Sequence, residues 1–181
     1  GDPCASGGVL VRLQVDAGEL VPTGGVLEQG YHVSYPYVFE HEGARCAIPE
    51  SRQNDEVALY RLENSGREWR KYAVLIAGLP AVDSSVFVHA GKFWLLCGLG
   101  DAGPTHNLHL YHADALTGPW RPHVRNPVKV DIRSARPAGA PFMLDGKLHR
   151  PAQDCTRKYG RRLTILRVNA IELVEDAFEI T

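Results

Sequence analysis

The chain has 181 residues, of which 44% are hydrophobic, so we expect one domain with a sizeable core over residues 1–181. Its formal net charge is −1 and charges of both signs are interspersed, which argues against a nucleic-acid or membrane-surface partner. No apolar run approaches the roughly 18 residues of a spanning helix, so no membrane span is expected.

The first thirty residues predict only part of a repeating unit. The stretch "VLVRLQVDAGELV" resembles two outer strands of a β-sheet. "GDPC" precedes it, without the hairpin that would complete such a unit. We therefore expect a partial unit over residues 1–30.

Residues 34–78 predict a four-stranded antiparallel sheet. Phe39 and Gly43 mark its first hairpin, because short β-branched or aromatic runs on both sides of a Gly-containing turn are typical of paired strands. Tyr60 and Trp69 mark a third and a fourth strand, separated by a polar turn. Trp69 is expected to be a buried anchor of the outer strand.

The same spacings recur further along the chain, roughly 50 residues apart, which is a period typical of propeller blades or a solenoid. The recurring residues are Phe87 with Gly91, Phe142 with Gly146, and Tyr111 with Trp120, and they place two further units at 83–128 and 137–181. Trp120 is expected to be the counterpart of Trp69.

These units predict an all-β fold, a β-propeller, because four antiparallel strands in about 50 residues make one blade. The 18 glycines and 12 prolines leave few windows for helices, which disfavours a helical repeat. Five blades need roughly 250 residues, so we expect a shortened or incomplete propeller of about three full blades plus part of another. An open blade edge must be covered, blunted or paired with another chain, so a homo-oligomer is one expectation.

Neither a metal nor a cofactor is expected. The four cysteines stand far apart without a CxxC pair, which favours buried thiols in a reducing compartment such as the cytoplasm over a zinc site or a disulfide framework; they are Cys4, Cys46, Cys97 and Cys155. His106, His109 and His112 resemble a ligand cluster, but on a strand His109 and His112 point to opposite faces.

Several polar residues are expected to share one rim of the propeller. If the first strand of a blade descends to the Gly turn and the second returns, residues before the Phe and about seven after the Gly meet at one face. This places Asp83, Glu50, Gln153, Asp154 and Arg136 around one funnel. Three of them have a structural alternative: a turn residue for Asp83, a solvated carboxylate for Glu50, and an ion pair between blades for Arg136.

An aromatic and polar group precedes the first hairpin. Tyr31, His32 and Tyr35 could stack on a sugar or hydrogen-bond to it, and packing in the core is an equal alternative.

Four stretches carry a resemblance to a known family: "YHVSYPYVFEHEG…IPES", "AVDSSVFVHAGKFWLL", "LYHADALTGPWRPHVRNPV" and "SARPAG…RPAQDCTRKYG". Together they resemble the N-terminal domain of glucosamine inositolphosphorylceramide transferases and its stand-alone bacterial relatives. That domain is similar to the five-bladed propellers of glycoside hydrolase families 43 and 32. The resemblance implies a carbohydrate-related domain and a carbohydrate or sugar-conjugate ligand. It does not imply glycosyl transfer, which belongs to a separate C-terminal domain.

The resemblance to family 43 also implies roles for carboxylates. "VDSSVF" resembles the strand whose Asp orients the catalytic acid and tunes its pKa, which corresponds to Asp83, and Asp2 in "GDP" resembles the general base. Glu50 could serve as the acid by position only, because the family order is Asp, Asp, Glu, whereas here a glutamate precedes Asp83.

Three functions stay open from the sequence. The first is an inverting glycoside hydrolase, which needs two suitably spaced carboxyl groups. The second is a non-catalytic carbohydrate-binding propeller that presents a glycan to a partner enzyme. The third is a degraded fragment without a site of its own.

Overall fold

The computed structural model describes residues 7–24, 26–63, 66–101, 103–171 and 178–180. This part of the chain is built from β-strands and one short 3₁₀ turn, η1 (Arg52–Asn54), and contains no α-helix. Within it, nothing helical has the length and apolar character needed to cross a membrane.

Three antiparallel sheets follow one another along the chain. The first contains β5 (Ser34–His41), β6 (Ala44–Glu50), β7 (Glu56–Glu63) and β8 (Glu68–Ala77). The second contains β9 (Ala81–His89), β10 (Lys92–Leu99), β11 (Asn107–Ala113) and β12 (Arg121–Pro122), and β13 (Lys129–Val130) also pairs with β11. The third contains β14 (Phe142–Leu144), β15 (Lys147–Asp154), β16 (Arg162–Ile171) and β17 (Phe178–Ile180).

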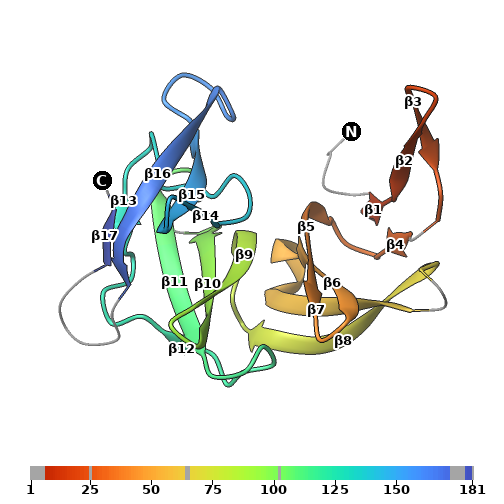
Figure 1. Cartoon of the computed structure of the whole chain (residues 1–181), viewed down its shortest axis with the longest axis horizontal. Coiled ribbons are helices and arrows are strands. Elements are labelled where there is room, and N and C mark those ends of the chain that lie inside the picture. The colour runs from red at the N-terminus through yellow and green to blue at the C-terminus, as the bar shows by residue number, and fades with distance from the viewer. Residues whose placement is uncertain (1–6, 25, 64–65, 102, 172–177, 181) are drawn as a thin grey trace.

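The N-terminal residues form two small pairs of strands instead of a full sheet. β1 (Val9–Leu10) pairs with β4 (Leu27–Glu28), and β2 (Leu13–Asp16) forms a hairpin with β3 (Glu19–Pro22). In Figure 1 these strands lie beyond the first sheet, at the opposite end of the molecule from the third. The arrangement agrees with three blades and part of another.

The three hairpins that open the sheets are equivalent in register, as their sequence spacing predicts. In each hairpin the Phe four residues before the Gly pairs with the residue three after it: Phe39 with Cys46, Phe87 with Trp94, and Phe142 with His149. Both central residues of each turn have positive φ, about 50° and 70°, as in a type I′ turn; these residues are Glu42 and Gly43, Ala90 and Gly91, Asp145 and Gly146.

The outer strand of the second sheet is shorter than the sequence predicts. Residues 119–128 contain three prolines, which lack the N–H that a sheet ladder needs, and β12 spans only two residues. Trp120 lies just before β12, where its indole N–H donates to the Leu116 carbonyl at 3.0 Å. Trp120 and Trp69 are partly buried and pack against two of the core clusters.

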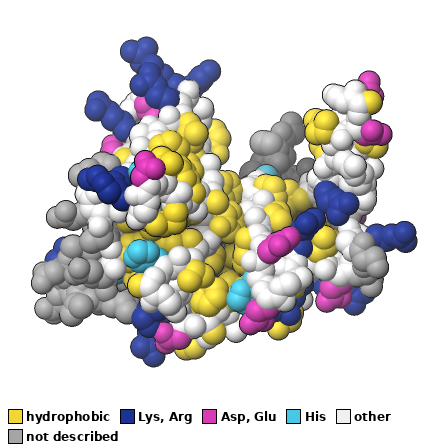
Figure 2. Space-filling model, viewed as in Figure 1, with side chains coloured by type: hydrophobic (Ala, Val, Ile, Leu, Met, Phe, Trp, Pro, Cys, Tyr) yellow, Lys and Arg dark blue, Asp and Glu magenta, His cyan; other side chains and the backbone are white. Residues whose placement is uncertain are grey.

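Apolar side chains fill the spaces between neighbouring sheets. One cluster joins the first and second sheets, through residues such as Ile48 and Leu95. A second joins the second and third sheets around Trp94 and Leu148. A third joins the first sheet to the N-terminal strands around Tyr60. Figure 2 shows apolar side chains over the middle of the molecule and charged ones toward its ends.

Three of the four cysteines are free and buried: Cys46, Cys97 and Cys155. Cys4 lies outside the described residues.

Candidate functional site

The inner strands of the first two sheets carry matching irregularities. Tyr35 lies four residues before Phe39, and Asp83 lies four residues before Phe87. Both residues have left-handed backbones, with φ of 43° and 53°. At both places the pairing with the second strand shifts register, as in a β-bulge. A bulge re-aims side chains, and non-glycine residues with positive φ cost energy and gather at functional sites.

Asp83 is buried at the end of the inner strand of the second sheet. Its side chain lies against the third sheet: Arg136 Nε is 2.6 Å from Asp83 Oδ2, and Gln153 Nε2 donates to the same oxygen at 3.3 Å. Gln153 also donates to the Pro137 carbonyl at 2.9 Å. Asp83 is only 2% exposed, so its ion pair with Arg136 is nearly free of solvent.

Glu50 approaches Asp83 from the first sheet. It ends β6 and pairs with Ser34 at the start of β5. Burial raises the pKa of Asp83 to about 6; Arg136 opposes the shift, and the charge of Glu50 and a hydrogen bond between the two carboxyl groups add to it.

A cavity of about 560 Å³ opens beside Glu50. Six of the seven residues that line it are polar or charged; the seven are His32, Glu50, Arg52, Gln53, Asp55, Pro80 and Asp101. The His32 backbone N–H donates to Gln53 Oε1 at 2.8 Å, and Arg52 lies 3.7 Å from Asp101. Three carboxylates against one guanidinium give the cavity an excess of negative charge. Asp83 is not among the lining residues, although the charge of Glu50 acts on it.

The structure thus brings Asp83, Glu50, Arg136 and Gln153 together, and places His32 in the adjoining cavity. It does not bring every expected residue there. Asp154 turns to Thr156, whose backbone N–H and hydroxyl donate to Asp154 Oδ1 at 3.0 and 2.7 Å. Alternate strand residues point to opposite faces, so Gln153 reaches Asp83 and Asp154 does not.

Tyr31 and Tyr35 form hydrogen bonds with other residues of the fold. The Tyr31 hydroxyl lies 3.1 Å from that of Tyr60, which is buried. The Tyr35 hydroxyl lies 3.0 Å from Ser85 Oγ, and burial raises the pKa of Tyr35 to about 12. Asp2, the expected general base, lies outside the described residues.

Sequence reasoning missed five of the seven residues that line the cavity, and also Tyr159, which contacts Arg136. Arg52, Gln53 and Asp55 follow Glu50 on the turn that includes η1, and Asp101 follows β10; a search of the residues after each returning strand would have found them. Tyr159 lies in the "RPAQDCTRKYG" string, yet no spacing rule singles it out. In the described part of the chain, no three His, Cys, Asp or Glu residues group as metal ligands.

Comparison with protein families supports a carbohydrate-related domain. The family described as "Glucosamine inositolphosphorylceramide transferase 1, N-terminal" matches residues 4–180. The glucosamine inositolphosphorylceramide transferase 1 of Arabidopsis thaliana is 33% identical over 160 residues, which are 85% of this chain and 21% of that protein. The protein of the same name from Oryza sativa subsp. japonica is 33% identical over 150 residues, 80% of this chain and 20% of that protein. The chain therefore spans about a fifth of the length of these relatives.

Solved structures show the fold. An exo-β-1,3-galactanase from Phanerochaete chrysosporium superposes with a TM-score of 0.62 at 13% identity, over 83% of this chain and 36% of the enzyme. An exo-β-1,3-galactanase from Clostridium thermocellum gives 0.63 at 14%, over 83% and 34%. A glycoside hydrolase family 43 protein from Bacillus licheniformis gives 0.60 at 14%, over 88% and 37%. The incomplete five-bladed propeller predicted from the sequence is confirmed.

Proposed function

Because the chain belongs to the family of glucosamine inositolphosphorylceramide transferase 1 N-terminal domains, and is a carbohydrate-related propeller, we propose that it binds a glycan or sugar conjugate in the cavity beside Glu50. One observation carries the proposal. Glu50 borders this open cavity and also interacts with Asp83, which forms a buried ion pair with Arg136.

The composition of the cavity suits a sugar. Carboxylates accept hydrogen bonds from sugar hydroxyls, while Arg52 and the amide of Gln53 can donate to them. The excess of negative charge disfavours phosphorylated or sulfated rings and favours a neutral sugar or a protonated amino sugar. The relatives are named for glucosamine, an amino sugar, which agrees with this preference.

Binding without hydrolysis is the function the geometry favours. Glycosidases keep their two carboxyl groups roughly 5–9.5 Å apart, with both in reach of the substrate. Glu50 borders the cavity, whereas Asp83 is buried and absent from its lining. A substrate in the cavity would therefore meet only one of the two carboxyl groups.

Hydrolysis is a second candidate, favoured by one observation. A carboxyl group with a pKa of about 6 is typical of tuned catalytic sites, and Asp83 resembles the tuning Asp of family 43. In that case Glu50 would act as the acid and Asp2 as the base.

Two further parts of the proposal concern partners. The chain would present its glycan to a glycosyl-transferring partner, because its relatives are named as transferases and it spans only about a fifth of their length. Self-association through an open blade also stays a proposal. It is supported by exposed apolar side chains on one face of the third sheet: Phe142, Leu144, Leu163 and Ile165.

A glycan array beside a hydrolysis screen tests the proposal on the wild type, Glu50→Gln and Asp83→Asn. Glu40→Gln is the matched control, because Glu40 lies on the same hairpin as Glu50 and is exposed. We expect wild-type binding, weaker binding in Glu50→Gln, no change in Glu40→Gln, and no turnover in any of them. Turnover that is lost in both site variants would instead support the hydrolase, and no binding to any glycan would contradict the site.

A further inference from the structure

We propose that Tyr159 forms an aromatic subsite beside the Glu50 cavity, on which a pyranose ring of the bound glycan stacks. The proposal rests on the proposed sugar binding and extends it to the class of sugar. A flat aromatic face selects a hexopyranose that presents an unbroken face of C–H groups.

Tyr159 is an exposed aromatic residue in the turn between β15 and β16, and 63% of it is accessible. The Arg136 guanidinium lies 4.7 Å from the centre of its ring, and Arg136 Nη2 donates to the Tyr159 hydroxyl at 3.3 Å. Because Arg136 occupies one face of the ring, the exposed area belongs to the other face and the edge. A stacking partner could therefore occupy that free face.

Arg136, which contacts the Tyr159 ring, is fixed by its own interactions. It is itself buried, ion-paired to Asp83 and within 3.4 Å of the Pro104 carbonyl, to which its Nη1 donates. An aromatic ring fixed before the ligand arrives loses little entropy on binding, which favours affinity.

The subsite lies within reach of the cavity. Arg136, which contacts Tyr159, also donates to the Pro104 carbonyl, and Asp101 of the cavity lies three residues before Pro104. Asp101 and Pro104 are therefore at most ~10 Å apart, and the Arg136 side chain bridges from Pro104 to the Tyr159 ring. A ligand with one ring in the cavity and a second on Tyr159 would thus be a disaccharide or a longer glycan.

The stacking chemistry is general. An aromatic ring has a negative face that attracts the weakly positive C–H groups of a sugar, and contact also removes apolar surface from water. β-D-Galactopyranose and β-D-glucopyranose both present such a face. An acyclic polyol cannot, and is a suitable negative probe.

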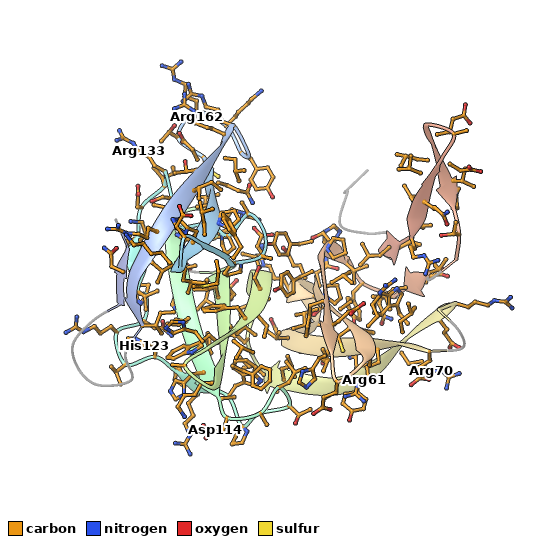
Figure 3. All side chains as sticks on the ribbon, in the orientation of Figure 1. Arg61, Arg70, Asp114, His123, Arg133 and Arg162 are labelled. Atoms are coloured by element: carbon orange, nitrogen blue, oxygen red, sulfur yellow. The ribbon has the colours of Figure 1, made fainter. Side chains whose placement is uncertain are left out.

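The chain offers a matched control. Tyr72, on β8, stacks on Arg61 with its ring centre 3.5 Å from the guanidinium carbon, and is 49% exposed. It repeats the tyrosine–arginine pair without the Asp83 network. Figure 3 shows Arg61 on the first sheet, far from Arg162, which begins β16 just after the Tyr159 turn.

Calorimetric titration with lactose, cellobiose, chitobiose and sorbitol tests the proposal on the full chain. We expect a disaccharide to bind the wild type, Tyr159→Phe to stay within threefold because the ring remains, and Tyr159→Ala to bind about tenfold more weakly. Tyr72→Ala should leave binding unchanged, and sorbitol should not bind.

The outcomes separate the two proposals. If Tyr159→Ala binds like the wild type while Glu50→Gln binds more weakly, the aromatic subsite is wrong and the cavity stands. If neither these disaccharides nor a longer glycan of the array binds the wild type, both proposals are wrong. If Tyr159→Ala fails to fold, saturation-transfer NMR tests the subsite instead. We expect magnetisation to pass from tyrosine ring protons to the sugar in the wild type, and this transfer to be lost in Tyr159→Leu. Absence of that transfer in the wild type overturns the subsite.

Discussion

At the scale of single residues, the buried carboxyl group of Asp83 organises the site. It has a left-handed backbone, a buried cation on one side and a second carboxyl group on the other. Each of these features costs energy in isolation, so their combination at one position is a sign of function more than of stability.

The first prediction concerns pH. The pKa of Asp83 in the folded chain, about 6, exceeds its ordinary value of 3.8, because burial disfavours the charged form. The folded state therefore binds this proton more tightly, and its stabilising effect is present below about pH 4 and lost as the pH rises through 6. The loss is roughly 3 kcal/mol at most. Urea unfolding at pH 4 to 7 should show this fall in the wild type and a flatter curve in Asp83→Asn; parallel curves would contradict the shift.

The second prediction concerns Arg136. Replacing it with Met leaves a buried carboxylate without its counter-ion, which we expect to lower the unfolding free energy by about 3–5 kcal/mol at pH 8. Arg136 lowers the pKa of Asp83, so its removal raises that pKa further. At pH 5, where Asp83 is largely protonated, the loss should be clearly smaller. A loss equal at both pH values would show that the pair is not a charge interaction.

At the scale of elements, the repeated hairpin is the unit of the fold. All three hairpins use a two-residue turn with positive φ at both positions. Only glycine adopts such a conformation freely, and Asn tolerates it better than Ala does. The middle hairpin, with Ala90 and Gly91, is therefore the least favourable of the three in its first position.

The third prediction follows from that hairpin. Gly91→Ala should destabilise by about 1–2 kcal/mol through backbone strain alone, because no atom lies within 4 Å of the added methyl group. Ala90→Asn should stabilise by up to about 1 kcal/mol. Gly30 also lies in open space but lacks a positive φ, so Gly30→Ala is the control and should not destabilise. Urea midpoints measure all three, and an equal loss in Gly30→Ala would contradict the turn argument.

At the scale of the whole molecule, hydrophobic clusters hold neighbouring sheets together. These interfaces differ in how completely they bury their tryptophan side chains. Trp94 is 2% exposed between the second and third sheets, and its indole N–H donates to the His89 carbonyl at 3.1 Å. Trp69 is half-buried between the first sheet and the N-terminal strands.

The fourth prediction compares these two tryptophans. Trp94→Ala should lower the unfolding free energy by about 3–5 kcal/mol, because it empties a closed interface. Trp69→Ala should cost less, since part of its surface already faces water. Thermal and urea unfolding give the order, and an equal or larger loss in Trp69→Ala would show that the N-terminal strands matter as much to the ring as the blade interfaces.

The sequence by itself determined the repeat. The Phe-to-Gly spacing predicted the register of all three hairpins, because a tight turn and a two-residue side-chain period leave only one pairing that keeps Phe39, Phe87 and Phe142 on one face. It also predicted that Glu50 and Gln153 share a rim, since both follow their turn glycine by seven residues.

Only the tertiary structure decided how those residues are used. Strand spacing places Gln153 and Asp154 at one rim, but the pleat sends only Gln153 to Asp83. Sequence spacing does not show which residues are buried. In the structure Asp83 is buried and does not line the cavity, whereas Glu50 does. The lining residues from η1 and the Tyr159 turn come from loops, whose paths depend on long-range contacts such as that of Tyr159 with Arg136 and not on local periodicity.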